Sequence, residues 1–254
     1  SIKFGLGEKV LNKTFSNEKK GLIPDTKWKK DNLGNSWVIG ETLITGIGQG
    51  YTQTTPLQLC QMTAQLANGG FKIYPKIIVE EDMKTAEQIR VIMNESRKNL
   101  NKENDGLEDA KDLLGFLNKT EHEPLFKDAK NINLIRESMF ASTNEVRGTS
   151  YSSRIEDPKY QFAGKTGTSQ VKRITEEDRE LDLKTSEIPY NDRDHALYIA
   201  FGPYNNPRYA LSVVVEHGGS GSSTAAPIAK KLFKLIIDRH VLREKTRKQK
   251  SIKI

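Results

Sequence analysis

The sequence predicts an α+β fold, in which an antiparallel sheet is flanked by helices. Three observations support this class. Segments with strand character gather in the last hundred residues, helical patterns with capping signals precede them, and one more helical pattern follows the last strand. With 254 residues, of which 35% are hydrophobic and 29% charged, the chain can bury a core, although it is polar for a globular protein.

The N-terminal region begins with turns. Residues 1–34 are rich in glycine, and a glycine loop at 46–50 offers three chances for positive φ. A helix follows, because Thr55 fits the N-cap position, Pro56 fits N1 and Gln58 fits N3 of a capping box. Apolar residues then recur at helical spacing until residues 68–70 (Asn-Gly-Gly) end the pattern. The glycines of the loop do not have the G-x-G-x-x-G spacing of a dinucleotide-binding site, so no cofactor is expected.

The middle of the chain divides into two parts. Residues 80–131 are charged, so we expect short helices on the surface there. Residues 133–144 have a clearer helical pattern, with Leu134, Ile135, Met139 and Phe140 at apolar positions, and Gly148 is a plausible stop.

Strands are predicted from residue 160 onward. Residues 160–163 form a short strand that leads into the sequence Gly164-Lys165-Thr166, and 195–201 and 209–215 form two more. A loop at 172–194, with five basic and eight acidic residues, is expected to be a solvated excursion, with partner docking as the alternative. The last helix follows residues 218–223, and its apolar residues fall on one face. Short links between consecutive strands indicate an antiparallel sheet that this helix covers.

Charge is concentrated at the C-terminus. Of the formal net charge of +7, +6 lies in residues 239–254, which we expect to be a solvated, disordered tail. Contact with an anionic surface, such as phospholipid or wall polymer, is the alternative, and nucleic acid is a weak third because no aromatics are interleaved. Cys60 is expected in the core, no residues have metal-ligand spacing, and neither a signal peptide nor a run of eighteen apolar residues is present.

The candidate catalytic residues are Lys165, Thr166 and Gly167. A lysine at a strand edge can attract a substrate carboxylate and keep a hydroxyl proton mobile. Thr166 and Thr168 point to one face of a strand, so their hydroxyls can grip a carboxylate. Gly167 lets a substrate backbone lie against the strand, and a strand N–H can donate to an oxyanion. The Gly-Lys-Thr sequence is not a phosphate loop, because position 159 is Lys159 rather than glycine.

A resemblance extends this three-residue signal over nearly the whole chain, apart from about 80–130 and the tail. The matching blocks are 3–7 (KFGLG), 21–24 (GLIP) with Trp28 and Lys29, 46–51 (GIGQGY) with 55–58 (TPLQ), 164–170 (GKTGTSQ), 194–196 (DHA), 203–207 (PYNNP) and 213–219 (VVVEHGG). In these blocks, and in their order, the chain resembles class B penicillin-binding proteins of the rod-elongation type, the penicillin-binding protein 2 group of peptidoglycan D,D-transpeptidases.

The resemblance implies the C-terminal part of the serine β-lactamase/D,D-transpeptidase-like fold over 1–238. Members are anchored in the inner membrane, face the periplasm and cross-link stem peptides through a serine acyl-enzyme. The D-Ala-D-Ala end of the stem peptide and β-lactams bind at the same site, and elongation-machinery proteins are possible partners. By motif, Lys165, Thr166 and Gly167 line the active site, and Thr166 and Thr168 hold the terminal carboxylate. The Thr168 N–H would be half of the oxyanion hole.

The nucleophile is the main departure from the family pattern. The family's S-x-x-K and S-x-N motifs precede the block at residues 3–7, so we expect the nucleophile on preceding chain and none here. The sequence has three other matches, at Ser16, at Ser169 and at Ser142. They are rejected because Ser16 lies in a turn, Ser169 follows the Lys165 strand, and the spacing between motifs is reversed.

Three functions stay open. The chain is part of a D,D-transpeptidase that works only when joined to its upstream half, or it is a non-catalytic remnant or binding module for wall peptide or partner proteins. The third is an autonomous serine hydrolase, such as a β-lactamase or carboxypeptidase, that uses one of the three other serines. In the family two upstream strands pair beside the last strand, so we expect the chain alone to be unstable or aggregated.

Overall fold

A computed structural model describes residues 1–11, 17–75, 123–126, 128–172 and 183–251, with side chains up to residue 242. It divides the chain into two compact units, Ser1–Ile135 and Arg136–Ile254. Each unit is described by itself below. Our expectation of one domain over 1–238 stays a prediction, and the surface helices expected at 80–131 fall almost entirely outside the described residues.

Among its described residues, the first unit includes the helices α1 (Thr26–Leu33), α2 (Ile39–Gly46) and α3 (Pro56–Ala67). The predicted capping box of α3 is confirmed. Thr55 Oγ1 accepts a hydrogen bond from the Gln58 N–H at 3.2 Å, and Gln58 Oε1 accepts one from the Thr55 N–H at 2.9 Å. The backbone N–H groups of Thr55 and Gln58, which have no acceptor within the helix, are thereby satisfied.

Glutamines on α3 hold the N-terminal turns in place. Gln58 is fully buried, and its Nε2 donates to the carbonyls of Glu8 and Lys20 at 2.7 and 2.8 Å. Gln65, which is 1% exposed, donates to the carbonyl of Phe4 at 2.9 Å. Long polar side chains in the core thus satisfy carbonyls of a segment that has little regular structure. Cys60, expected in the core, is half-buried, and burial raises the pKa of its thiol.

Helices α1 and α2 lie in a region where the sequence indicated mainly turns. Asp25 caps α1 by accepting from the Trp28 N–H at 2.6 Å. Lys29 of α1 is 6% exposed, and it pairs with Glu41 of α2 at 2.5 Å and donates to the Ser36 carbonyl at 2.7 Å. The hydrogen bond and charge of Lys29 hold the pKa of Glu41 below its usual value. A partly buried ion pair therefore joins α1 to α2.

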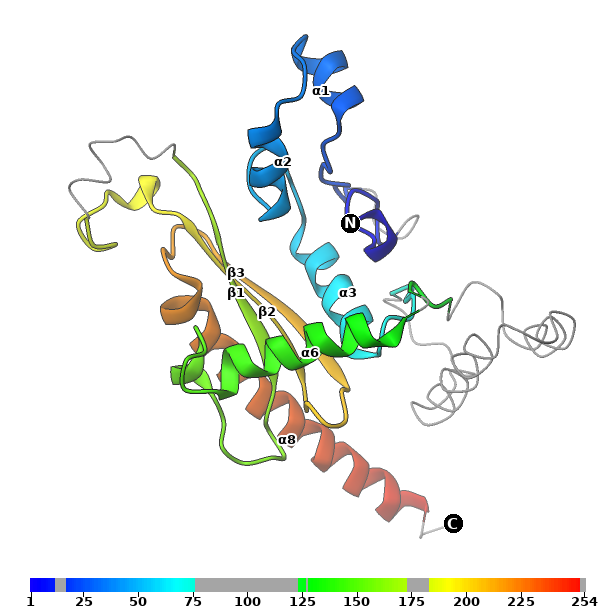
Figure 1. Ribbon diagram of the computed structural model, residues 1–254. Helices are drawn as coiled ribbons and strands as arrows, with labels where there is room; N and C mark the ends of the chain where they lie inside the picture. The colour runs from blue at the N-terminus through cyan, green and yellow to red at the C-terminus, as the bar shows by residue number, and fades with distance from the viewer. Residues whose placement is uncertain (12–16, 76–122, 127, 173–182, 252–254) are drawn as a thin grey trace, which may run out of the picture. The chain divides into compact units, whose positions relative to one another are not determined.

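Helix α6 (Ala129–Asn144) ends in the second unit, which also contains strands β1 (Ala163–Ser169), β2 (His195–Gly202) and β3 (Tyr209–Val215). The strands form an antiparallel sheet in the order β1-β2-β3, in which Lys165 lies opposite Ile199 and Ile199 opposite Ser212 (Figure 1). The predicted α+β class and antiparallel sheet are confirmed. The predicted start of the strand at residue 160 is wrong by three residues: a turn ends at Tyr160, Phe162 is buried in the core, and pairing begins at Ala163.

Helix α8 (Ala226–Ser251) covers one face of the sheet. Ala196, Tyr198 and Ala200 alternate along β2 and are fully buried with Phe233 of α8. Phe233 also stacks on Phe162, with ring centroids 4.9 Å apart. The helix continues through most of the basic segment 239–254, for which the sequence analysis expected disorder. None of the helices in the described part of the chain is long and apolar enough to span a bilayer.

Candidate active site

Strand β1 presents the predicted catalytic motif at an edge of the described sheet. Lys165 is exposed, and its Nζ donates to the carbonyl of Thr166 at 2.7 Å and to Thr166 Oγ1 at 3.3 Å. Thr166 lies opposite Tyr198 and Thr168 opposite Ala196, so the two threonines share one face of the strand. The structure therefore brings together the charge and the hydroxyls that the sequence singled out. Their catalytic roles stay predictions.

A line of hydroxyls leads from this motif to helix α6. Thr166 Oγ1 lies 3.3 Å from Thr149 Oγ1, which lies 3.2 Å from Ser142 Oγ. Together with the Lys165 contact, they form a continuous polar path of four side chains. The sequence analysis did not select Thr149. The one signal in the sequence was Gly148, the residue before Thr149. The chain turns closely here, and a Cβ on residue 148 would lie only 2.5 Å from the carbonyl oxygen of Ala141.

The buried phenol of Tyr198 joins β2 to the end of α6 and to the turn that follows it. The Tyr198 hydroxyl lies 2.9 Å from Thr143 Oγ1 at the end of α6 and 3.0 Å from Ser150 Oγ in the following turn. All three side chains are fully buried, and burial raises the pKa of the Tyr198 phenol. The ring passes directly under Gly164, where any Cβ would overlap the phenol. Glycine at this position is thus required by close packing, which explains the Gly164-Lys165-Thr166 sequence without a phosphate loop.

Gly167 of the motif packs against the turn that precedes α8. The short π-helical turn Gly221–Ala225 precedes α8 and packs against β1 and β2. A Cβ on Gly221 would lie 2.7 Å from the carbonyl oxygen of Gly167 and 2.5 Å from that of Leu197. The backbone of the π-helical turn before α8 therefore touches the backbone of the motif strand directly. Any side chain at residue 221 would displace the strand at Gly167.

The far end of β1 is fixed by histidines that the sequence analysis did not select. Ser169 lies opposite His195, whose Nδ1 accepts a hydrogen bond from the His217 N–H at 3.0 Å. The two rings are 4.8 Å apart in an edge-on arrangement, and the Asp194 carboxylate accepts from the Val171 N–H at 3.1 Å. These contacts join the end of the motif strand to the ends of β2 and β3.

The structure also places two of the three other serine motifs. Ser142 is followed one helical turn later by Glu145, so no lysine can share its proton, and Asn144 donates to the carbonyls of Phe140 and Phe162 at 3.1 and 3.0 Å. Ser169 ends a strand rather than opening a helix. Ser16 lies outside the described residues. Ser142 and Ser169 therefore lack the helical Ser–Lys geometry of the expected nucleophile.

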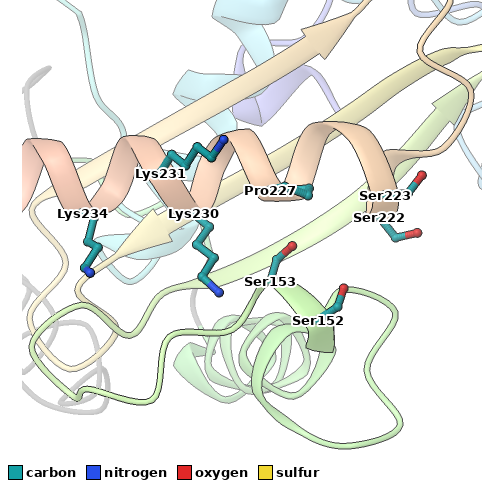
Figure 2. Close-up of a pocket in the computed structure, with 8 residues that line it drawn as sticks. All are labelled: Ser152, Ser153, Ser222, Ser223, Pro227, Lys230, Lys231 and Lys234. Atoms are coloured by element: carbon teal, nitrogen blue, oxygen red, sulfur yellow. The ribbon is translucent and has the colours of Figure 1, made fainter.

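Within the described residues no three histidine, cysteine, aspartate or glutamate side chains are placed to hold a metal ion. A cavity in the second unit is lined by residues of α8, its first turn and the turn at 151–153, and by none of β1 (Figure 2). This cavity is thus separate from the Lys165 motif.

Comparison with known proteins identifies the class. Residues 2–234 match the penicillin binding protein transpeptidase domain, and the chain belongs to this family. Among curated relatives, the peptidoglycan D,D-transpeptidase MrdA of Escherichia coli K12 is 30% identical over 249 residues, which are 94% of this chain and 32% of the relative. MrdA of Haemophilus influenzae is 31% identical over 233 residues, 91% of this chain and 30% of the relative. The chain thus spans about a third of the length of these relatives.

Solved structures agree with this assignment. The penicillin-binding protein PBP2 of Helicobacter pylori, solved in complex with MreC, matches with a TM-score of 0.67 and 26% identity over 93% of this chain and 34% of that one. PBP2 of Pseudomonas aeruginosa, solved with WCK 5153, matches with a TM-score of 0.63 and 31% identity over 92% of this chain and 42% of that one. The resemblance to penicillin-binding protein 2 is confirmed by both comparisons.

Proposed function

We propose that the chain is the C-terminal part of a peptidoglycan D,D-transpeptidase domain, with the nucleophilic serine on an upstream part of the same protein. The observation that carries this proposal is β1, which holds Lys165, Thr166 and Thr168 at an open edge in a domain of the penicillin-binding family. In this role Lys165 and Thr166 line the acyl site, and Gly167 leaves room for the substrate backbone. Thr166 and Thr168 bind the terminal carboxylate of a D-Ala-D-Ala stem peptide or a β-lactam.

The charge and geometry of β1 support its proposed role in binding the substrate carboxylate and the oxyanion. The ammonium of Lys165 lies beside the Thr166 hydroxyl, so it favours an anionic group there and polarises that hydroxyl. The Thr168 N–H would donate to the oxyanion. Neither role uses a metal or cofactor.

Two exposed surfaces support the need for a second part of the domain. Ile39 and Leu43 of helix α2, and Ile47 directly after it, have 83%, 70% and 78% of their surface exposed. These residues are spaced four apart and form one apolar stripe, whereas the polar Glu41 is turned inward to Lys29. In the described sheet β3 pairs only with β2, so its other edge is open, and Val214 is 37% exposed. An upstream part that pairs with β3 and covers α2 would bury both.

The cellular setting is also a proposal, and it rests on the family resemblance. We propose that the whole protein acts at the periplasmic face of the inner membrane. The Helicobacter pylori relative was solved in complex with MreC, and we propose a partner of the same kind from the elongation machinery for this protein.

Intact-protein mass after incubation with a penicillin tests the proposal. The 254-residue chain alone should gain no adduct, and the chain joined to an upstream part with S-x-x-K and S-x-N should gain one. In that longer protein, Lys165→Met should slow acylation by roughly a hundredfold or more, the effect of losing a group that assists proton transfer. Lys130→Met, at an exposed lysine in the first unit, should leave the rate unchanged.

Either of two results would contradict the proposal. A stoichiometric adduct on the chain alone would make the fragment an autonomous serine hydrolase, and peptide mapping would name its serine. An unchanged acylation rate in the Lys165→Met variant would remove the motif strand from the chemistry and favour the non-catalytic binding module.

A further inference from the structure

His217 in the second unit has a backbone conformation that its side chain disfavours. Among the residues that the structure describes, it is the only non-glycine residue with a positive φ, at 54°. It lies just beyond β3 and is followed by Gly218 and Gly219. The left-handed region is unfavourable for a residue with a Cβ, so surrounding contacts have to hold His217 there. Residues strained in this way concentrate at functional sites.

Two hydrogen bonds and two ring contacts hold His217 in place. Its backbone N–H donates to His195 Nδ1 at 3.0 Å, and its own Nδ1 lies 3.0 Å from the carbonyl oxygen of Arg193. Its ring centroid lies 4.8 Å from that of His195, edge-on, and 5.0 Å from that of Tyr190. His217 therefore joins the end of β3 to the start of β2 and to the segment that leads into β2.

These partners determine where the protons of both rings lie. A backbone N–H can only donate, so His195 Nδ1 has to be an unprotonated acceptor, and this ring carries its proton on Nε2. A carbonyl can only accept, so His217 Nδ1 carries a proton. The contact between the two residues thus requires a neutral His195. An imidazolium has N–H groups on both nitrogens and would place a donor against the His217 N–H.

The charges around the two rings nearly balance. The Asp194 carboxylate accepts from the Val171 N–H at 3.1 Å, and the Arg193 guanidinium lies over the Tyr190 ring. The charged residues on the segments that pack around the rings are Lys172, Lys184, Glu187, Asp192, Arg193, Asp194 and Glu216. Three of these are cationic and four are anionic. The charge state of His195 therefore acts on His217 mainly through their hydrogen bond.

The start of β2, which His217 anchors, is also the partner of the end of the motif strand. His195 lies opposite Ser169 in the last pair of β1 with β2, and Ala196 lies opposite Thr168. The place of Thr168, whose N–H is the proposed oxyanion donor, therefore depends on how the first residue of β2 is held.

The loop that begins at His217 supports the same strand from a second direction. The Gly219 N–H donates to the Asp194 carbonyl at 2.8 Å, and a Cβ on Gly221 would lie 2.7 Å from the carbonyl oxygen of Gly167. Gly221 follows His217 by four residues. A shift of His217 would thus move the backbone that packs against Gly167 as well as the ring that holds β2.

From these observations we propose that His195 and His217 are positioning residues for the proposed acyl transfer. The neutral ring of His195 holds His217 in its strained conformation, and together the two residues keep the end of β1 in place, so that the Thr168 N–H can donate to the oxyanion. Neither ring forms a bond to the substrate or moves a proton in the reaction. This inference rests on the proposed transpeptidase function.

Acylation of the complete protein by a fluorescent penicillin, between about pH 5.5 and pH 8, tests the role of His195. His195→Phe keeps a ring and removes the acceptor, whereas the amide oxygen of His195→Asn can take the place of Nδ1 as an acceptor that does not titrate. At the alkaline end His195→Phe should be acylated roughly tenfold more slowly, as part of the effect of an oxyanion donor is lost. His195→Asn should restore most of that rate.

The loss should fall on the acylation step rather than on initial binding of the penicillin, because the oxyanion forms only in the transition state. His240→Phe is the matched control. It removes another half-buried imidazole of the second unit, one that contacts Arg208 and Tyr209, and it should be acylated within about twofold of the parent rate.

The pH dependence separates positioning from a purely structural role. Imidazoles take up protons between about pH 5 and pH 8, and a protonated His195 no longer accepts from His217. The rate of His195→Asn relative to the parent should therefore rise severalfold toward the acid end, whereas the relative rate of His240→Phe should stay constant. An unchanged rate in His195→Phe, or a relative rate of His195→Asn that does not vary with pH, would overturn the proposal.

Hydrogen exchange separates failure of this inference from failure of the proposed function. Toward acid, amides of residues 163–171 should lose protection, relative to their intrinsic exchange rates, in the parent but not in His195→Asn. If Lys165→Met is acylated at the parent rate, the proposed function itself is wrong. If Lys165→Met is slow but the protection of residues 163–171 is equal in the parent and His195→Asn across the pH range, only the histidine proposal is overturned.

Discussion

Removing the apolar stripe of α2 should abolish most self-association of the chain. The triple variant Ile39→Gln/Leu43→Gln/Ile47→Gln keeps good helix formers while replacing side chains that are 83%, 70% and 78% exposed. Full burial of such a side chain contributes about 1.5 to 3 kcal/mol, so covering the exposed part of all three is worth roughly 3 to 7 kcal/mol. That gain favours the association of copies through this face, in addition to the open edge of β3.

Sedimentation velocity over a range of protein concentrations measures the effect. The parent chain alone should form concentration-dependent oligomers or aggregates, and the variant should shift strongly toward monomer. A control with Leu134→Gln, Val146→Gln and Leu242→Gln changes three exposed apolar residues that lie far apart in the sequence and should change little. The reasoning is refuted if the parent chain is a monomer throughout, or if the control disperses it as well as the stripe variant does.

Two further predictions concern stability in the complete protein. Tyr198→Phe should lower the free energy of unfolding by about 1 to 2 kcal/mol in urea titrations, because Thr143 and Ser150 each lose one buried partner, and an unchanged midpoint would show that the phenol bond is dispensable. Glu41→Gln should destabilise the protein at neutral pH. The pKa of Glu41 is lowered in the fold, so its contribution is complete above the ordinary carboxylate pKa and is lost as the pH falls through the lowered value. The melting temperatures of parent and variant should therefore converge in acid, and a pH-independent difference would exclude the ion pair with Lys29 as the cause.

Local signals made the helix α3 and the strands β2 and β3 predictable. The capping box at Thr55 and Gln58 is satisfied within four residues, and the β-branched run of β3 needs no distant partner to be recognised. The start of β1 was misplaced because Tyr160 and Phe162 are aromatic and favour strands, whereas Phe162 lies just before the strand and stacks on Phe233 in the core.

Helix α2 escaped prediction because its pattern is inverted. An amphipathic helix is recognised by an apolar face that meets a core, but here the apolar stripe is exposed and Glu41 faces Lys29 instead. The candidate site was predictable only in part for a similar reason. Lys165 and Thr166 are adjacent in sequence, whereas Thr149 joins them through a contact across seventeen residues that no local pattern encodes.

The packing of Tyr198 under Gly164 also constrains how this sequence can evolve. No single substitution at residue 164 fits while the phenol occupies the space of its Cβ. A smaller residue at 198 would make that room, but it would first release Thr143 and Ser150 from the sheet. A lineage must therefore change the two positions together or pass through a weakened intermediate. Variants that reshape the motif strand to escape β-lactams are thus expected at neighbouring exposed positions, such as Thr168, before residue 164.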